Sequence, residues 1–320
     1  MFSINHIQEN GFEKVRLTDS TANIFAEIIP GCAAMLYNFS IVLGDQTHNV
    51  ISSYTSKNEF ETQLTQRGFR GVKLSPFVCR INKGKYSFGG NEYELEKFIT
   101  NGNALHGELF DKDFKVVNET SNKDFASVTM SYSYEQEDPG YPFFYDCEIE
   151  WKLSANGHLT AITTSTNKDK GLIPIQDGWH PYFSLGGRID DVYLEFQSKE
   201  MVVFNDNLIP TGEMKEYDKF NSIKKFGDTV YDNCFTLNMD TCQPMCVLKN
   251  KETGIQVSFI PSASYPYIQL YTPDDRMSIA IENISGPPDG FNSNTGFQTL
   301  EPGQSAQYEI TYQLTSSKYF

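Results

Sequence analysis

The chain contains 320 residues, of which 41 are acidic and 26 are basic, so its formal net charge is −15. Hydrophobic residues make up 39% and charged residues 21% of the sequence, a balance typical of a folded globular protein. A negative charge of this size repels the phosphates of nucleic acids, and no run approaches the roughly 18 apolar residues that would span a membrane. The sequence therefore predicts neither a nucleic-acid nor a membrane partner. The first residues do not resemble a targeting segment, which predicts a cytoplasmic protein.

Alternation of apolar and polar residues is the dominant pattern along the chain. A short helix is the best helical candidate near residues 60–66, and the pair Gly89–Gly90 then predicts a hairpin. The segment DCEIEWKL (146–153) alternates strictly, the pair Asn156–Gly157 predicts a second hairpin, and YEITYQL (308–314) alternates again. Such segments are typical of half-buried antiparallel strands. We expect an all-β fold of two large, stacked antiparallel sheets with little helix.

No internal repeat, low-complexity tract or linker divides the chain, so residues 1–320 are predicted to form a single domain. The six cysteines are scattered, with no CxxC pair and no neighbouring histidine cluster. This spacing favours buried free thiols, and we predict no metal site.

Two of the five histidines stand in unusual surroundings. His106 precedes Gly107, and a glycine there permits the backbone to approach another segment closely. His180 lies within QDGWHPYFSLGG, between aromatic residues. Each is either a histidine of the core or a titratable group held in an apolar site. If strand-like alternation persists, His180 and Tyr182 share one face, whereas Trp179 and Phe183 belong to the other. His6, His48 and His158 lie in polar or terminal surroundings and are expected to be solvent residues.

Three charged residues follow apolar runs. Glu282 comes after Met277–Ile281 and is expected at the end of a strand, where burial would raise the pKa of its carboxyl group and suit it to act as a general base. The alternative is an exposed glutamate. Asp232, within VYDNCF, is either a second buried acid or a turn cap. Arg80 ends the run LSPFVC and needs an acceptor if it is half-buried.

Six blocks of the sequence together carry a resemblance. They are LSPFVCRINKGKYSFGGNEYEL with Arg80, NGNALHG with His106, GWHPYFSLGG with His180, VYDNCF with Asp232, AIENISGPPDGFN with Glu282, and LEPGQSAQYEITYQL near the end. In this order they resemble the aldose 1-epimerases, or galactose mutarotases, and their hexose-phosphate relatives. The blocks run from about residue 70 to 314, which is most of the chain. The resemblance implies the family's two-sheet supersandwich.

Four positions depart from the family's usual pattern. Cys79 stands in place of an asparagine, Glu108 in place of a second glycine, Pro181 in place of a serine, and Gln304 in place of a glutamate. These departures leave the expected acid and base in place but bear on which sugar is preferred.

The resemblance implies exchange of the two anomers of a sugar hemiacetal by ring opening. Glu282 would take the proton of the anomeric hydroxyl, and His180, as an imidazolium, would donate a proton to the ring oxygen. Arg80, His106 and Asp232 would bind the oxygens of the sugar. The reaction needs no metal and no cofactor, and each general acid or base contributes on the order of 10²–10⁴-fold in rate.

The leading hypothesis is an aldose 1-epimerase that acts on free neutral hexoses. A second is a hexose-6-phosphate mutarotase, because Arg67, Arg70, Lys73 and Arg80 form a locally basic stretch. A third is a non-catalytic sugar-binding protein on the same scaffold. All three give the chain a small sugar as its partner, and the sequence makes no prediction of the oligomeric state.

Overall fold

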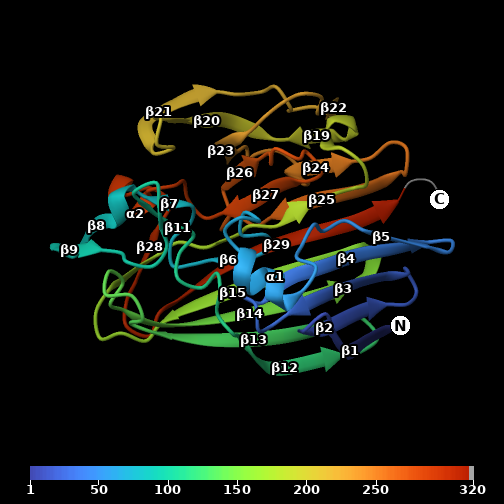
Figure 1. The fold of residues 1–320 in the computed structure, drawn as a ribbon, viewed down its shortest axis with the longest axis horizontal. Helices are drawn as coiled ribbons and strands as arrows, with labels where there is room; N and C mark the ends of the chain where they lie inside the picture. The colour runs from blue at the N-terminus through green and yellow to red at the C-terminus, as the bar shows by residue number, and fades with distance from the viewer. Residues whose placement is uncertain (317–320) are drawn as a thin grey trace.

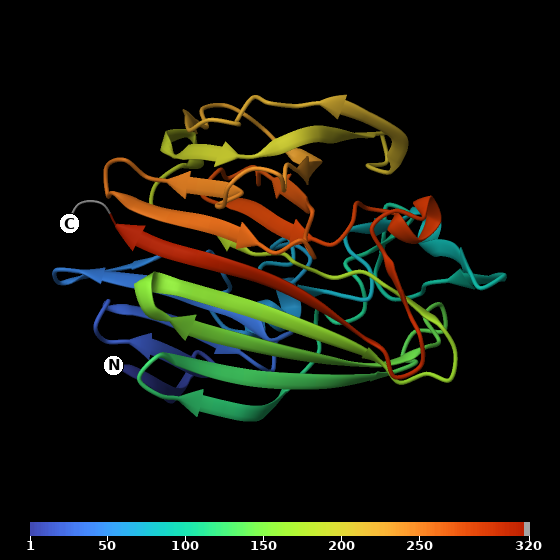
Figure 2. The same cartoon turned by 180° about the vertical axis from the view of Figure 1, so that it is seen from behind.

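A computed structural model describes residues 1–316, and β-strands dominate it (Figure 1). One layer is a nine-stranded antiparallel sheet that is seen from behind in Figure 2. In spatial order its strands are β12 (Lys115–Ser121), β13 (Phe125–Glu135), β14 (Phe144–Ser154), β15 (His158–Asn167), β29 (Ser305–Ser316), β25 (Ile255–Pro261), β24 (Cys246–Lys249), β19 (Tyr193–Phe196) and β22 (Lys224–Lys225).

Two antiparallel sheets form the layer in front. The first consists of β1 (Phe2–Glu9), β2 (Phe12–Asp19), β3 (Ile24–Ile29), β4 (Met35–Leu43) and β5 (Gln46–Asn49). The second is ordered β21 (Pro210–Glu216), β20 (Ser198–Phe204), β23 (Asp232–Leu237), β26 (Tyr267–Tyr271), β27 (Ile279–Ile284), β17 (Gly178–Trp179) and β6 (Lys73–Leu74), with β18 (Tyr182–Phe183) also paired to β27. A bridge between Ile51 and Phe183 joins the two sheets into one layer. The expectation of an all-β fold with two stacked antiparallel layers is confirmed.

Smaller elements lie at the periphery. The three-stranded sheet β10-β11-β7 contains Ile99–Thr100, Asn103–Leu105 and Arg80–Ile81, while β8 (Lys85–Phe88) pairs with β9 (Asn91–Glu94) and β16 (Ile173–Ile175) with β28 (Gln298–Leu300). The α-helices are α1 (Lys57–Gln63) and the single turn α2 (Gly290–Ser293). The sequence predicted the first helix near residues 60–66, three residues later than it lies. The helix begins earlier because Ser56 caps its N-terminus by accepting the Glu59 N–H. Within the part of the chain described here, no helix has the length and apolarity needed to cross a membrane.

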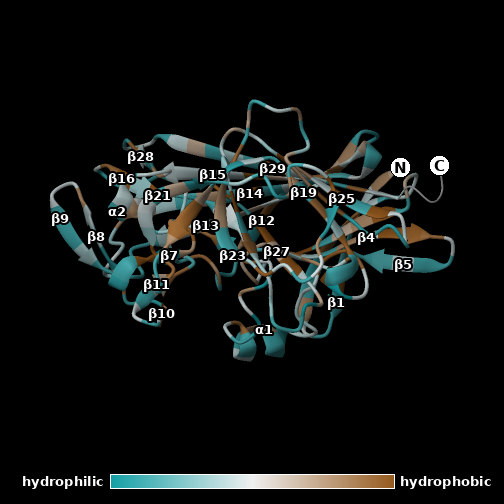
Figure 3. Ribbon diagram, turned by 90° about the horizontal axis from the view of Figure 1, so that it is seen from above, coloured by the Kyte–Doolittle hydropathy of each residue, from teal (hydrophilic) through white to brown (hydrophobic). Residues whose placement is uncertain are grey.

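Alternation in the sequence explains how the layers share a core. The buried residues of β14 include Cys147, Ile149, Trp151 and Leu153, whereas the residues between them are exposed or half-buried. Strand β29 repeats this pattern. Both predicted hairpins are present, with positive φ at Asn156–Gly157 and at Gly89–Gly90. Hydrophobic colour follows strands such as β4, whereas α1 and the β8–β9 hairpin are hydrophilic (Figure 3). All six cysteines are free, and only Cys242, in a turn after β23, is exposed, contrary to the expectation of burial for all.

A buried ion pair lies between the layers. The Lys73 ammonium group donates to the Asp177 carboxylate at 2.5 Å, and both side chains are fully buried. Lys73 also donates to Thr163 Oγ1 on β15 of the opposite layer, and the Tyr265 hydroxyl donates to Asp177 at 2.5 Å. Asp177 exchanges further hydrogen bonds with Ser285, directly after β27. The pair therefore fixes β6, β17 and β27 relative to one another and to the opposite layer.

Glu108 is a buried carboxyl group with no hydrogen-bond partner on either oxygen. Its backbone N–H donates to Ser75 O, and its carbonyl accepts from Lys97 Nζ at 2.6 Å. Burial raises the pKa of Glu108 to about 8, although Lys97 opposes the shift. Because this folded-state pKa lies above the unfolded value, the folded form loses stability as pH rises from about 4.5 to about 8.

We expect Glu108→Gln to stabilise the protein at alkaline pH, because the amide keeps the shape of the neutral acid and cannot ionise. The urea midpoint of the variant should exceed that of the wild type at pH 8 and approach it at pH 4.5. Glu61→Gln, at a position where the side chain is 58% exposed, is the control and should show no such pH-dependent difference. Parallel pH dependence of the wild type and Glu108→Gln would mean that Glu108 is ionised in the fold.

Candidate active site

The register of three adjacent strands sets a row of polar side chains on one face of the second front-layer sheet. Cys234 on β23 pairs with Gln269 on β26, which pairs with Glu282 on β27. Asp232 lies two residues before Cys234 and therefore on the same face. Gln269 Nε2 donates to Asp232 Oδ1 at 2.9 Å. Asp232 and Glu282 thus lie near one another with Gln269 between their strands.

Glu282 lies in the interior of a strand and not at its end. All six residues of β27 are buried, and pairing with β26 continues to Ile284. The sequence suggested an earlier end because Gly286–Pro287 follows so closely, but the turn begins only after Ser285. Glu282 is 1% exposed, and its Oε2 has no hydrogen-bond partner. A carboxyl group in this position faces the site without being neutralised by a direct ion pair to a lysine or arginine.

His180 is held between β17 and β18. Its N–H donates to Val72 O, and its carbonyl accepts from Gly71 N–H. The imidazole stacks on the Tyr182 ring with centroids 5.2 Å apart and planes within 7°. The neighbouring aromatic residues point into the core, where Trp179 contacts Trp151 and Phe183 contacts Phe259. The predicted division of these four side chains between two faces is therefore correct.

His106 approaches His180 from the other side. It follows β11 with a φ of +68°, and its N–H donates to Cys79 O at 2.7 Å. The two imidazole centroids lie 4.8 Å apart, edge to face. The following glycine is required by close packing, since a Cβ on Gly107 would lie 2.3 Å from Ser75 O. This contact sets the His106 ring beside His180.

Arg80 and Asp232 close the polar side of the site. Their nearest atoms, Nη2 and Oδ2, are 3.7 Å apart. Asp232 begins β23 and pairs with Tyr271, so the alternative role as a turn cap does not describe it. Across the site, His180 Nε2 lies 3.5 Å from Glu282 Oε1. The structure thus brings together five residues that are spread over some two hundred positions.

All five line one pocket of about 320 Å³. Tyr182 also lines it, as expected of a residue on the same face as His180. The remaining lining residues were not predicted, and they are Thr65, Gly68, Phe69, Cys79, Phe98, Thr100, Leu105, Gln269 and Tyr271. Gln269 left a signal in the sequence, because it is a polar residue inside the apolar strand YIQLY. Its Oε1 is buried without a partner, so the pocket offers an unused acceptor beside Asp232. A lining that combines aromatic side chains with hydrogen-bonding groups suits a small polar ring compound.

Burial controls the charges of the facing pair. It raises the pKa of Glu282 well above its usual value, reinforced by Asp232 and opposed by Arg80. Burial also lowers the pKa of His180 to about 3, and the positive charges of Arg80 and Arg70 act in the same direction. Burial therefore favours a neutral imidazole facing a protonated carboxyl group. This differs from the expected imidazolium and carboxylate, because sequence alone does not show how completely both groups leave water.

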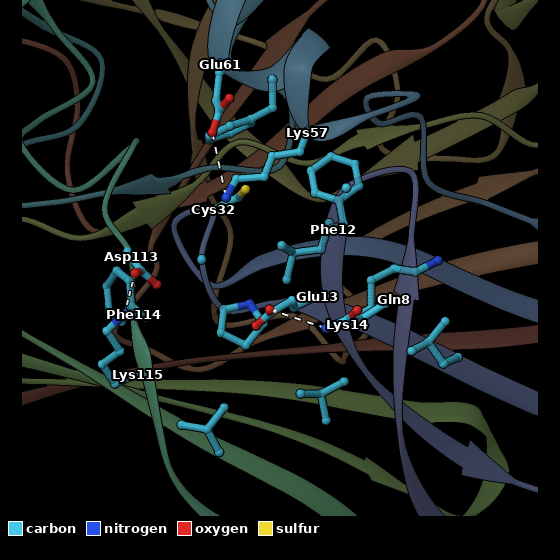
Figure 4. Close-up of a pocket in the computed structure, with 18 of the residues that line it drawn as sticks. Gln8, Phe12, Glu13, Lys14, Cys32, Lys57, Glu61, Asp113, Phe114 and Lys115 are labelled. Carbon is cyan, nitrogen blue, oxygen red and sulfur yellow. Dashed lines mark hydrogen bonds and ion pairs between the residues drawn. The ribbon is translucent and has the colours of Figure 1, made fainter.

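Larger pockets exist elsewhere, but the side chains that line them do not bring together buried titratable groups as the 320 Å³ pocket does. One of about 860 Å³ lies between β1, β2, α1 and residues 111–116 (Figure 4). Its charged groups form surface pairs such as Lys57–Glu61 at 3.7 Å and Lys115–Asp113. The Cys32 thiol borders it, with its pKa raised to about 12 by burial. Volume alone does not identify a site, whereas converging titratable groups do.

The basic stretch of the sequence does not form one cationic surface. Lys73 is paired with Asp177 in the core, and Arg67 Nε lies 3.0 Å from Glu59 Oε1. Arg70 is buried against Tyr182, and only Arg80 lines the pocket. Among residues 1–316, no group of three histidine, cysteine, aspartate or glutamate side chains is placed to hold a metal ion.

The fold and this pocket define a β-sandwich of the galactose mutarotase-like class. A model of the aldose 1-epimerase family matches residues 40–313, and the chain belongs to that family. It is 25% identical over 241 residues to the uncharacterized protein YihR of Escherichia coli K12, covering 73% of this chain and 75% of YihR. It is 23% identical over 258 residues to the galactose mutarotase of Bos taurus, covering 75% and 72% of the two chains.

Solved structures share the fold over nearly the whole chain. A galactose mutarotase-like protein from Clostridium acetobutylicum superposes with a TM-score of 0.85 at 17% identity, covering 98% of this chain and 99% of the other. An aldose epimerase homologue from C. elegans superposes with a TM-score of 0.83 at 19% identity, with the same coverage.

Two glutamates of the C-terminal region differ sharply in their surroundings. Glu282 is buried in the pocket, whereas Glu301 is exposed before Pro302 and its N–H donates to Gln304. We expect Glu282→Gln to slow anomer exchange by at least about 100-fold, and Glu301→Gln to change it by less than about threefold. NMR measurement of exchange at equal folded concentration checks both. The reverse order would move the reaction away from this pocket.

Proposed function

We propose that the protein is a mutarotase that interconverts the α and β anomers of a free, uncharged hexose by opening and closing its ring. The observation that carries this proposal is the facing pair His180 and Glu282, 3.5 Å apart and almost fully buried. The anomeric hydroxyl and the ring oxygen of a sugar are bonded to the same carbon. An acid and a base that act on both must therefore converge on neighbouring points, as these two side chains do.

Ring opening moves one proton onto the base and another off the acid. In the assignment that we favour, Glu282 removes the proton of the anomeric hydroxyl while His180 donates one to the ring oxygen. The C1–O5 bond breaks, an aldehyde forms, and rotation about C1–C2 presents its other face. Closure returns both protons. Arg80, His106 and Asp232 bind sugar oxygens, and Gln269 adds an acceptor next to Asp232.

The proton distribution that burial favours fits one half of this cycle. After ring opening, Glu282 holds a proton and His180 has lost one, which is the state that burial favours. A site in this protonation state is complementary to the open-chain aldehyde: its carboxyl group can protonate the carbonyl oxygen while the imidazole accepts the proton of the attacking hydroxyl. To start from the ring form, the single proton of the pair must move to His180 when the sugar displaces water.

A single shared proton predicts a bell-shaped pH dependence of kcat/KM. Activity falls when a second proton binds the pair and again when the last proton leaves, and both limbs belong to the pair as a unit. Because burial lowers the pKa of His180 to about 3 and raises that of Glu282, the acid limb is expected below pH 4.5. Exchange rates measured by NMR over the range in which circular dichroism shows a folded protein check this. An acid limb above pH 4.5 would contradict the proposed distribution.

The uncharged substrate follows from the charges of the lining. Of the described residues around the pocket, only Arg80 carries a lysine or arginine charge, and Asp232 lies beside it. A sugar phosphate would meet a single cation, Arg80, which Asp232 already faces at 3.7 Å, and no second cation to offset its charge. This disfavours the hexose-6-phosphate alternative. Arg70 is nearby, but the Tyr182 ring lies between it and the pocket.

A panel of aldoses and their 6-phosphates tests the function. We expect the protein to accelerate exchange of glucose or galactose over the spontaneous rate, with kcat/KM at least about tenfold higher than for the matching 6-phosphate. Equal or greater activity on the phosphates would establish the alternative substrate class. Tight sugar binding without acceleration would instead identify a non-catalytic binding protein.

A further inference from the structure

Arg70 is a buried arginine close to the site but outside its lining. It lies between α1 and β6 and is 6% exposed. Its Nε donates to Arg67 O at 3.1 Å, its Nη1 donates to Ser52 Oγ, and its Nη2 lies 4.0 Å from Asp275 Oδ2. These contacts come from three different segments and hold the guanidinium group in one place.

The guanidinium group contacts the ring on which His180 stacks. Its Cζ lies 4.8 Å from the centre of the Tyr182 ring, and the His180 imidazole lies 5.2 Å from the same centre. The Tyr182 hydroxyl donates to Gly68 O at 2.9 Å, which fixes the ring from its far end. A cation over an aromatic face is an attractive contact, so Arg70 restrains Tyr182 and Tyr182 restrains His180.

We propose that Arg70 is a positioning residue for the reaction: it acts through Tyr182 to hold the His180 ring toward Glu282, and its positive charge disfavours protonation of that ring. The inference rests on the proposed function for its catalytic consequence. Its electrostatic consequence is a change in the protonation of His180, which can be measured without a substrate.

The charges that face His180 come from several elements. Glu282 approaches from β27, His106 from the end of β11, Arg80 from β7 and Arg70 from beyond Tyr182. Among residues 1–316, Glu282 is the only acid in direct contact with His180, at 3.5 Å. Both arginines lower the pKa of His180, in addition to the larger effect of burial. Arg70 differs from Arg80 in that it does not line the pocket, so its substitution leaves the sugar-binding groups in place.

Two substitutions separate the two parts of the proposal. Arg70→Lys keeps the charge but lacks the planar fork that reaches Ser52 and Arg67 O, so it tests positioning. Arg70→Gln removes the charge as well. Arg188→Gln is the matched control, because Arg188 is a surface arginine, 53% exposed, that pairs with Asp190 and does not line the pocket.

We expect both Arg70 variants to lower kcat by on the order of 3- to 30-fold while KM stays within about twofold. The acid limb of the pH profile should move upward in Arg70→Gln only. Charges that lie at most about 10 Å apart in a partly shielded interior change a pKa by roughly 0.3 to 1 unit. Arg188→Gln should match the wild type in both measurements.

NMR titration of the His180 ring provides the readout that is independent of activity, with the resonance identified by its absence in His180→Asn. Arg70→Gln should raise the pKa of His180, and Arg70→Lys should leave it unchanged. If the wild type accelerates no sugar, the proposed function fails while this titration still decides the electrostatic inference. Wild-type kcat and an unshifted His180 in Arg70→Gln would overturn the inference.

A double-variant cycle tests whether Arg70 acts through Tyr182. Once Tyr182→Leu has removed the ring, Arg70→Lys should have less than half of its effect on log kcat, because the contact that transmits it is gone. Full additivity of the two substitutions would show that Arg70 acts by another route. Thermal unfolding of each variant establishes that all are compared as folded protein; if Arg70→Gln does not fold, Arg70→Lys and the cycle remain decisive.

Discussion

The buried ion pair between Lys73 and Asp177 is the interaction on which the geometry of the pocket depends. It connects the strand before His180 to the strand that carries Glu282, and through Thr163 and Tyr265 it reaches the opposite layer. Removing one member of such a pair leaves an uncompensated charge in the interior, at a cost of about 3–5 kcal/mol. Directional contacts of this kind resist sliding of one strand past another, whereas apolar packing alone tolerates it. Asp177 precedes His180 by three residues, and its partner Ser285 follows Glu282 by three residues. The ion pair in the core therefore holds both segments whose side chains lie 3.5 Å apart.

The sequence predicted the architecture because the physical signals for it are local. Strict alternation in β14 and β29, and glycines at the two hairpins, depend only on neighbouring residues. Scarce histidines and charged residues after apolar runs made the five site residues candidates, but only the family resemblance gave them roles, because each motif alone left a core, surface or turn position open. What remained hidden depends on pairing between distant strands. Gln269 and Tyr271 enter the pocket through the register of β26 with its neighbours, and the extension of β27 past Glu282 is stabilised by pairing that no local pattern reveals.

Charge was the other property that sequence could not supply. The sequence predicted a raised pKa for Glu282 but expected an imidazolium at His180, whereas the environment favours the neutral form of both groups. Desolvation favours the neutral form of each group, because it penalises whichever form is ionised. It therefore raises the pKa of the carboxyl group and lowers the pKa of the imidazole. Asp232 disfavours the Glu282 carboxylate, and Arg80 disfavours the His180 imidazolium. Arg80 opposes the shift at Glu282, so burial more than the surrounding charges sets the neutral forms and leaves the shared proton on the carboxyl group.

The place of β29 within the nine-stranded sheet has a consequence for biosynthesis. This strand, residues 305–316, lies between β15 and β25 in the interior of the sheet. While the chain is being synthesised, one edge of β15 and one edge of β25 stay unpaired until β29 has emerged from the ribosome. The layer behind the pocket closes only then, so the nascent chain carries an unpaired edge of β15 throughout the synthesis of residues 168–304. Its folding in the cell depends on how quickly the final strand inserts relative to contact with other chains.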